Sequence, residues 1–380
     1  MKQSIPRGLR VGRIILLGVS VLFVLLSGTV YADGEVRSVV FLIGDGMGIS
    51  QVAAARIKTH GAGGRLNMEK LPVTGLMDTH PAAGLVTDSA SAGTALATGC
   101  KTNNRMVSMN PDGKKLRTIL ESCRDSGMAT GLVVTCALTH ATPAVFAAHV
   151  KSRYDQPAIA GQLLESGVTV MLGGGEGFFL PRSRPGSKRS DERNLMAEFR
   201  KRGYAVVRTR EELLNVPGDR VLGLFHAGHL TTRSPEPSLA EMTRKAIELL
   251  SRGGKGFFLM VEGSQIDFAC HANNADETIR QTVLFDKAVG AAVAFARENG
   301  QTLVIVTADH ETGGMGINGG SPDGGNVSIG WTSGGHTAVP VPIYAFGPGA
   351  ERFTGLHDNT DIPRIFADLL GMKSFGERDR

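Results

Sequence analysis

Continuous apolar stretches of strand length recur along the chain, and helical patterns separate them. These stretches are apolar throughout rather than at every second residue, which is typical of strands in a parallel sheet covered on both faces. The clearest of them span 39–43, 131–135, 168–172, 256–261, 303–307 and 341–346. The sequence therefore predicts an α/β fold with a doubly wound, mostly parallel central sheet and helices on both faces.

Polar residues mark helix starts between the predicted strands. Ser238 and Glu241 form a capping-box pattern that predicts a helix ending near residue 250. Further helices are predicted at about 276–298 and from residue 361 onwards. This alternation of strands and helices is that of a doubly wound domain.

Two segments interrupt the alternation. The Arg/Ser/Pro-rich segment 181–193 predicts an exposed loop whose charges need no catalytic role, and the Gly-rich segment 313–335 is too short for a second domain. We therefore expect one catalytic domain over 33–380 with no large inserted domain.

The first 32 residues have the organisation of a secretory signal peptide. An apolar run at 14–26 follows a basic start, and residues 30–32 place small side chains at the positions that determine cleavage. An uncleaved membrane anchor is the alternative, but the apolar core is shorter than the ~20 residues that a spanning helix needs. We expect cleavage after Ala32 and an exported protein, periplasmic or extracellular. The basic start consists of Lys2, Arg7, Arg10 and Arg13.

The positive net charge belongs mostly to this leader. The whole chain has a formal net charge of +5, but without the four basic residues of the leader 37 basic side chains stand against 36 acidic ones. A nearly neutral mature chain gives no support to nucleic-acid binding, and we expect no membrane contact after cleavage.

The cysteines do not form a recognisable motif. No C-x-x-C spacing occurs, so neither a cysteine zinc site nor a thioredoxin-like motif is indicated. Export permits disulfides, but the spacing leaves their pairing open. The cysteines are Cys100, Cys123, Cys136 and Cys270.

A serine hydroxyl beside a carboxylate, Asp88-Ser89, stands where an Ala-rich helix is expected to begin. Alone this is an ordinary helix start. Carboxylates and histidines, however, follow several of the predicted strands, and the carboxyl ends of parallel strands meet at one edge of a sheet. A serine among so many metal ligands suggests a hydroxyl activated by metal ions.

The strongest ligand candidates lie in three segments. Asp267 and His271 are four residues apart, so a helix places both on one face, where they can share a zinc ion. A capped helix with incidental surface polar residues is the alternative for this pair. Asp309 and His310 end a strongly apolar strand before glycines, which favours ligation, and Asp45 lies in a Gly-flanked turn.

Other polar residues are weaker candidates on their own. Glu262 ends a predicted strand, His140 and Thr142 would complete an oxygen-rich site, and His336 alone reads as a loop histidine. We expect Cys270 to be a small buried residue that fills space rather than a metal ligand. Histidines assigned to structural or surface positions are His149, His226, His229 and His357.

Six motifs in fixed order carry a resemblance to a known family. They are Asp-Gly-Met-Gly, Thr-Asp-Ser-Ala-Ser, His-Ala-Thr-Pro, Val-Glu-Gly-Ser-Gln-Ile-Asp, Thr-Ala-Asp-His-Glu and Gly-Gly-His-Thr. In this combination the chain resembles the alkaline phosphatases over about 36–370, with a looser fit over 178–220. The resemblance implies a bacterial, exported, metal-dependent enzyme that hydrolyses small-molecule phosphate monoesters and releases inorganic phosphate and an alcohol.

The resemblance also implies roles for individual residues. Ser89 would be the nucleophile that becomes phosphoserine, Arg153 would bind the phosphoryl oxygens, and Asp88 would orient that arginine. The cofactors would be two zinc ions and a third metal, usually magnesium. The first zinc would be held by Asp267, His271 and His336. The second, which also contacts the serine, would be held by Asp45, Asp309 and His310. The third site would be completed by Thr142 and Glu262, with Asp45 as a bridge.

Two positions depart from the best-known bacterial form of the family. His140 stands where that form has an aspartate, which would favour zinc or cobalt over magnesium in the third site. Phe268 stands where it has a lysine, so weaker binding of the phosphate product is expected. The short segment 313–335 lacks an insertion that some relatives use for dimer contacts, and homodimer formation is left open.

Two other classes of function compete with phosphomonoester hydrolysis: hydrolysis of sulfate esters or phosphodiesters, and binding without turnover. A sulfatase would need a C/S-x-P-x-R pattern, which the residues after Ser89 do not match, whereas a preference for phosphodiesters is not excluded by the motifs. A metal- or phosphate-binding protein without turnover would not require Ser89 and Arg153 together. The physiological substrate is not indicated by the sequence.

Overall fold

The computed structural model of this protein describes residues 1, 34–372 and 375. Nearly all of the predicted signal peptide, residues 2–32, lies outside the described residues. Every described helix and strand belongs to the compact unit formed by residues 31–380. Among the described residues, no helix has both the length and the hydropathy that crossing a bilayer requires.

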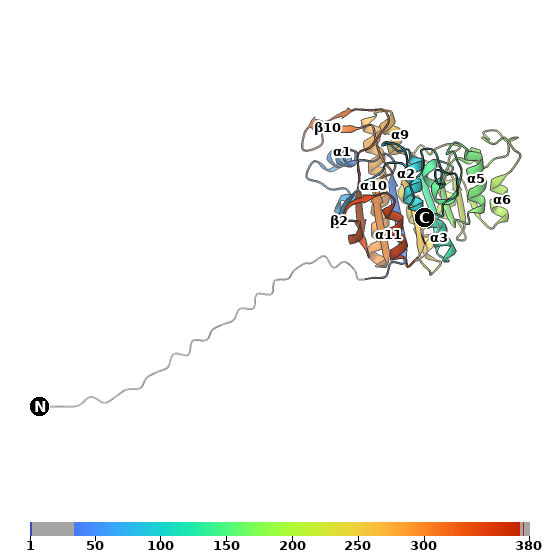
Figure 1. Ribbon diagram of the computed structural model, residues 1–380, viewed down its shortest axis with the longest axis horizontal. Coiled ribbons are helices and arrows are strands. Elements are labelled where there is room, and N and C mark those ends of the chain that lie inside the picture. The colour runs from blue at the N-terminus through green and yellow to red at the C-terminus, as the bar shows by residue number, and fades with distance from the viewer. Residues whose placement is uncertain (2–33, 373–374, 376–380) are drawn as a thin grey trace. The chain divides into compact units, whose positions relative to one another are not determined.

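A central sheet of ten strands organises the chain (Figure 1). Neighbouring strands are parallel except that β13 runs antiparallel to both β8 and β2. The predicted mostly parallel sheet is therefore confirmed. The order across the sheet is β14 (Gly355–Asp358), β2 (Val73–Asp78), β13 (Val341–Phe346), β8 (Thr302–Thr307), β1 (Ser38–Gly44), β7 (Phe257–Gly263), β3 (Ala129–Ala137), β4 (Val170–Gly174), β6 (Val221–Leu224) and β5 (Ala205–Val207).

Two groups of helices cover this sheet, and the members of each group pack on one another (Figure 1). Because both faces are covered, every residue of β1, β7 and β8 is buried, as their unbroken apolar sequences require. One group consists of α1 (Ile49–His60), α8 (Leu239–Ser251) and α10 (Ala275–Asn299). The other consists of α2 (Ser89–Thr98), α3 (Ile119–Asp125), α4 (Ala141–Ala147) and α11 (Asp361–Leu369).

Shorter elements complete the chain. The small antiparallel pair of β10 and β11 lies within the Gly-rich segment 313–335, and the pair of β9 and β12 flanks it. The strands of these pairs are β9 (Glu311–Thr312), β10 (Met315–Gly320), β11 (Val327–Trp331) and β12 (His336–Thr337). The remaining helices are α5 (Gln156–Glu165), α6 (Leu195–Lys201), α7 (Arg210–Leu214) and α9 (Gln265–His271), with 3-10 turns η1 (Met68–Lys70), η2 (Glu176–Phe178) and η3 (Ala350–Phe353).

The predicted helix starts are confirmed. The Ser238 hydroxyl accepts from the backbone N–H of Glu241, and the Glu241 carboxylate accepts from the backbone N–H of Ser238, which is a complete capping box for α8. The helix predicted at 276–298 is α10, capped by Asn274, and the helix predicted from residue 361 is α11.

Four strands of the central sheet were not predicted, namely β2, β5, β6 and β14, and the short strands β9, β10, β11 and β12 were not predicted either. In β2 buried and exposed residues alternate, because one face of this strand near the sheet edge is open, so it contains no continuous apolar run. β5 is only three residues long. A search for continuous apolar runs finds the centre of such a sheet and misses its edges.

The prediction of an exposed loop at 181–193 was wrong for two residues, Pro181 and Arg189, which are buried. Most of the segment is exposed, but the Arg189 side chain is only 4% exposed. Its guanidinium donates to the backbone carbonyls of Pro157 and Phe178 and forms an ion pair with Asp191 at 2.6 Å. Arg189 thus anchors the loop, because its buried charge is fully paired.

The candidate residues follow the strands of the sheet centre. Asp45 comes directly after β1, and Glu262 is the penultimate residue of β7. Asp309 follows β8, and His140 follows β3. Since these four strands are parallel and adjacent, their carboxyl ends bring the side chains to one edge.

Candidate active site

An open cavity of about 990 Å³ lies at this edge of the sheet. Its wall combines predicted site residues with side chains that were not predicted to belong to the site. The predicted members are Asp88, Ser89, His140, Arg153, Asp267, His271 and His336. The others are Ala83, Asn103, Asn104, Arg105, Tyr154, Gln156, His229 and Phe268.

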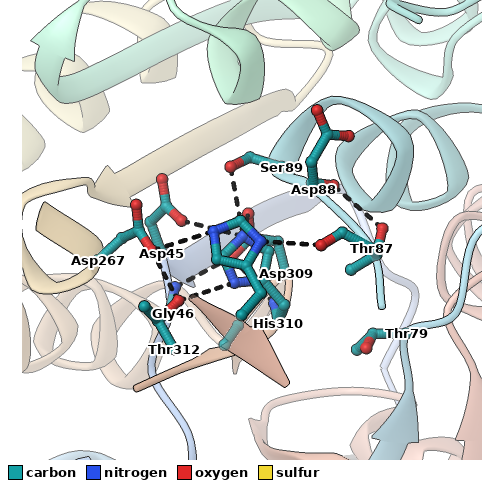
Figure 2. Close-up of polar contacts among 12 residues, drawn as sticks. Asp45, Gly46, Thr79, Thr87, Asp88, Ser89, Asp267, Asp309, His310 and Thr312 are labelled. Carbon is teal, nitrogen blue, oxygen red and sulfur yellow. Dashed lines mark hydrogen bonds and ion pairs between the residues drawn. The ribbon is translucent and has the colours of Figure 1, made fainter. Parts of the chain in front are cut away.

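Ser89 is the first residue of α2 and is almost fully buried. The preceding residue, Asp88, caps the helix by accepting a hydrogen bond from the backbone N–H of Ser91 at 2.9 Å. The Ser89 hydroxyl oxygen lies 3.3 Å from Nε2 of His310, a contact that joins two distant parts of the chain (Figure 2). The serine therefore stands at a helix N-terminus, where backbone N–H groups and the helix dipole favour an anion.

Asp88 also holds Arg153 at the cavity. Nη1 of Arg153 donates to Oδ2 of Asp88 at 3.2 Å, and the backbone N–H of Arg105 donates to both oxygens of the same carboxylate. Burial alone would raise the pKa of Asp88, but the N–H of Ser91 and the charge of Arg153 lower it on balance. The carboxylate is thus ionised and orients the guanidinium in the cavity wall.

Asp267, His271 and His336 form one group of potential ligands. Nδ1 of His271 and Nδ1 of His336 lie 2.7 and 2.8 Å from backbone carbonyl oxygens, which can only accept, so both Nδ1 atoms carry a proton. In the neutral rings the two Nε2 lone pairs then face each other across 3.1 Å. Both Nε2 atoms also lie within 3.5 Å of Oδ1 of Asp267.

Such an arrangement requires a proton or a metal cation between the rings. The hydrogen bond with Asp267 raises the pKa of His271 to about 9, because the carboxylate stabilises positive charge at this point. Two imidazole nitrogens and one carboxylate oxygen are the donor set that zinc prefers. The three residues therefore fit a zinc ion.

Asp45, Asp309 and His310 form a second group, and all three are fully buried. Nε2 of His310 lies 3.2 Å from Oδ2 of Asp309 and 3.5 Å from Oδ1 of Asp45. Both oxygens of Asp45 and Oδ2 of Asp309 lack a hydrogen-bond partner among the described residues. Burial, followed by the negative charge of Asp309, raises the pKa of Asp45 well above its usual value.

Thr312 determines which nitrogen of His310 faces this group (Figure 2). The Thr312 hydroxyl donates its proton to Oδ1 of Asp267 at 2.6 Å, so it must accept from Nδ1 of His310 at 3.2 Å. In the neutral ring Nε2 therefore carries the lone pair, and it points at the Asp45 and Asp309 carboxylates. Acceptors crowded in this way, buried and unpaired, fit a second zinc ion.

Glu262, Thr142 and His140 form a third group, of which His140 lines the cavity and the other two are fully buried. Oε1 of Glu262, Oγ1 of Thr142 and Nδ1 of His140 are buried and lack a hydrogen-bond partner among the described residues. Burial and the Asp309 carboxylate raise the pKa of Glu262 to about 7, and burial together with Arg153 lowers the pKa of His140 to about 3. A neutral imidazole and unpaired oxygens fit a third cation.

The structure thus brings all the predicted site residues to one edge of the sheet. Three contributors were missed from the sequence: Thr312 between two groups, Cys136 beside Glu262, and His229 in the cavity wall. Cys136 ends an apolar strand and carries no distinguishing signal. His229 was assigned a structural or surface position, whereas its ring lies against Phe268, with the ring centroids 4.9 Å apart.

Comparison with known proteins gives a consistent result. The sequence model of the family described as "Alkaline phosphatase" matches residues 36–329 and 324–372. The chain is 37% identical to alkaline phosphatase 4 of Bacillus subtilis, with 88% of this chain and 89% of that protein covered. It is 35% identical to the alkaline phosphatase of Escherichia coli, with 90% and 88% covered.

Solved structures agree with the sequence comparisons. The structure of alkaline phosphatase from the Antarctic bacterium TAB5 matches with a TM-score of 0.83 and 33% identity, covering 90% of this chain and 100% of that one. The alkaline phosphatase of Thermus thermophilus matches with a TM-score of 0.82 and 28% identity, covering 91% and 94%. A TAB5 variant is described with magnesium bound in its M3 site.

Proposed function

The chain belongs to the alkaline phosphatase family and hydrolyses phosphate monoesters, and from that premise we propose that it acts through a phosphoserine formed on Ser89 at a site of two zinc ions and a third metal. The observation that carries this proposal is the position of the Ser89 hydroxyl, 3.3 Å from Nε2 of His310 and at the N-terminus of α2. A nucleophile needs such a place, beside metal-ligand candidates and at the positive end of a helix dipole.

We propose the following distribution of ligands, on the donor chemistry and the unpaired atoms described above. The first zinc is held by Asp267, His271 and His336. The second is held by Asp45, Asp309 and His310. The third metal is held by Glu262 and Thr142, with Asp45 as a bridge and His140 nearby. The relative with magnesium in its M3 site supports a third metal, which is magnesium here or, because of His140, zinc or cobalt.

When bound, these cations supply the positive charge that makes a serine hydroxyl and water nucleophilic near neutral pH and that offsets charge on the leaving oxygen. The Ser89 oxygen attacks phosphorus in line with the leaving alcohol, and the N–H groups at the start of α2 face the phosphoryl oxygens. Water then hydrolyses the phosphoserine and restores the hydroxyl.

Arg153 binds two phosphoryl oxygens with its planar fork, which a lysine would not reproduce. Asp88 fixes the guanidinium through the 3.2 Å hydrogen bond. The Phe268 side chain in the cavity wall adds no charge, so release of the phosphate product is easier than with a cation at this position. The open cavity suits a broad range of small phosphate monoesters.

The test of the nucleophile is a pair of alanine variants in the same helix. Ser89→Ala is expected to lower the turnover of an aryl phosphate monoester by at least about 10³-fold while zinc content is unchanged. Thr98→Ala is the matched control and should keep the activity, because the Thr98 hydroxyl lies at the other end of α2 and donates to the backbone carbonyl of Thr94. Acid quenching of the native enzyme with labelled substrate should trap label on Ser89. An unchanged rate in Ser89→Ala would refute the assignment.

We also propose that residues 33–380 form a single exported catalytic domain, released after Ala32. The organisation of the first 32 residues supports this. N-terminal sequencing of the protein recovered outside the cytoplasm should begin at Asp33. A first residue at Met1 would contradict the proposal.

A further inference from the structure

A thiol, that of Cys136, lies beside the third ligand group, and the proposed function gives it no role. Cys136 is the penultimate residue of β3 and is completely buried. Its sulfur lies 3.3 Å from Oε2 of Glu262. We propose that Cys136 is a direct ligand of the third cation, with Glu262 and His140, and that this sulfur makes the site select zinc or cobalt over magnesium. The inference rests on the proposed three-metal site.

The geometry is that of a metal site. A ligand atom of Cys136, one of His140 and one of Glu262 all lie within 4.8 Å of one another. With zinc–sulfur bonds near 2.3 Å and zinc–oxygen bonds near 2.0 Å, two ligands of a tetrahedral ion stand about 3.3–3.7 Å apart. The 3.3 Å between the Cys136 sulfur and the Glu262 oxygen fits this spacing without movement of the backbone.

A second observation points to an ion at the same place. Oε1 of Glu262, Oγ1 of Thr142 and Nδ1 of His140 are buried polar atoms without a hydrogen-bond partner among the described residues. Cys136 belongs to the same hydrophobic core as Cys123, but its sulfur also lies beside the Glu262 carboxylate, whose other oxygen is unpaired among the described residues. Polar atoms buried without a partner lose their hydration, and a cation bound between them would compensate for that loss.

The chemistry of sulfur gives the site its selectivity. Magnesium prefers six oxygen ligands in an octahedron, whereas thiolate and imidazole favour zinc and cobalt. Binding converts the Cys136 thiol and a divalent cation into a thiolate–metal bond, and the proton leaves to solvent. His140, whose pKa lies far below neutrality, contributes as a neutral imidazole.

Coordination by His140 also affects Arg153. Without a cation, Nη2 of Arg153 donates to Nε2 of His140 at 3.1 Å, which places the ring proton on Nδ1. A cation at Nδ1 moves that proton to Nε2, and two donors then face each other. Loading the third position through this ring therefore releases the guanidinium from His140, while Asp88 retains it at the cavity.

The test is the optical spectrum of the purified enzyme reloaded with cobalt alone. Sulfur bound to cobalt gives an intense near-ultraviolet charge-transfer band that oxygen and nitrogen ligands do not give. The native chain should develop this band, and Cys136→Ser and Cys136→Ala should lack it. Cys136→Ser should also bind the third cobalt about 10–100-fold more weakly, and magnesium should compete better by a similar factor, because an oxygen replaces the sulfur.

Two other buried cysteines serve as matched controls. Cys123 lies in the core of the fold, and Cys270 contacts Gln51 and Thr278. Cys123→Ala and Cys270→Ala should both keep the band, and circular dichroism checks the folding of every variant. A native chain without the band, or a Cys136→Ala variant that keeps it, would overturn the inference.

The outcome is separable from that for the proposed function. The cobalt titration is repeated in Ser89→Ala, where no turnover occurs if the nucleophile is assigned correctly. The band should be the same in that background. An active Ser89→Ala variant with a normal band would refute the phosphoserine step but support the thiolate ligand. An inactive Ser89→Ala variant without the band would support the phosphoserine step and refute the thiolate ligand. If Cys136 only donates its hydrogen bond to Glu262, the band is absent in every variant and the inference fails.

Discussion

Two clusters of histidine and carboxylate among the described residues are built in opposite ways. In the first, His149 meets Glu121: Nδ1 of the ring lies 2.9 Å from the carbonyl of Ser108, and Nε2 lies 3.0 Å from Oε1 of Glu121. The other Glu121 oxygen accepts from the backbone N–H of Thr118 in a capping box. Each polar atom of this pair has a protein partner.

In the cluster of Asp45, Asp309 and His310, by contrast, several polar atoms lack a hydrogen-bond partner in the part of the chain that the structure describes. Three carboxylate oxygens there have no hydrogen-bond partner among the described residues, and the histidine turns a lone pair towards them. The pKa shifts differ accordingly. Burial alone would raise the pKa of Glu121, but the hydrogen bonds from His149 and from the backbone N–H of Thr118 together with nearby positive charge lower it on balance, whereas burial raises the pKa of Asp45 well above its usual value.

The difference shows what distinguishes a ligand set from a structural ion pair. Both clusters combine histidine with carboxylate, and although the first is partly exposed while the second is fully buried, these properties alone do not separate a ligand set from an ion pair. The pairing of each polar atom does, because a fully paired cluster stabilises the fold by itself, whereas an unpaired one needs a cation. Variants in the two clusters should therefore have opposite consequences.

The largest expected effect is the loss of activity when a ligand is removed from the unpaired cluster. His310→Ala should lower monoester turnover by about 10³-fold or more, because several kcal/mol of charge stabilisation in the transition state are lost with the cation. Steady-state rates and zinc content measured together check this. His149→Gln should keep most of the activity, and comparable losses in the two variants would contradict the distinction.

The next effect concerns the metal-free protein. Asp45→Asn should raise its free energy of unfolding by about 1–3 kcal/mol, since one of several crowded buried negative charges is removed. Urea unfolding of the chelated native chain and the chelated variant measures the difference. A less stable variant would show that these carboxylates are paired in a way that the geometry does not indicate.

In the paired cluster the sign should be reversed. Glu121→Gln retains the capping box but replaces a charged hydrogen bond to His149 with a neutral one, so the free energy of unfolding should fall by about 1–2 kcal/mol. Phosphatase activity should be unchanged. Urea unfolding with metals bound is the measurement, and a stabilised variant would break the comparison.

The smallest effect is the pH dependence of that stabilisation. Burial alone would lower the pKa of His149, but its hydrogen bond with Glu121 raises it, so its contribution is complete below the unfolded value of about 6.5 and is lost as pH rises through the folded value. The Glu121 pKa is lowered, so its contribution is complete above about 4.3 and is lost as pH falls.

The stability difference between the native chain and Glu121→Gln should therefore be largest between about pH 4.3 and pH 6.5 and fall by less than about 1 kcal/mol towards alkaline pH. Unfolding curves across this range measure it. A difference that grows with pH would contradict the pairing of His149 with Glu121.

The centre of the fold was predictable from the sequence because it depends on short-range patterns. The strands that became β1, β7 and β8 are apolar throughout, and such runs need no knowledge of the rest of the chain. The direction of β13 was not predictable, since a continuous apolar run is the same for a parallel and an antiparallel strand. The strand β2 was missed because its buried and exposed residues alternate and form no continuous apolar run.

The site also contains residues that the sequence predicts and residues that it does not. Asp45, Asp309 and Glu262 stand at strand ends, so the topology alone places them together. Thr312 and Cys136 were missed because their contacts, with Asp267 and with Glu262, join segments 45 and 126 residues apart in the chain. Whether a polar atom has a hydrogen-bond partner depends on which residues surround it in the folded protein. Local sequence patterns do not carry this information.

The single proton of the Thr312 hydroxyl links two ion positions. It is given to Asp267, a candidate ligand of the first zinc, and the oxygen takes a proton from His310, a candidate ligand of the second. Neither half of this relay can reverse without the other. If both ions bind as proposed, arrival of one would fix the orientation of the neighbouring ring for the other, and we expect the two positions to fill cooperatively.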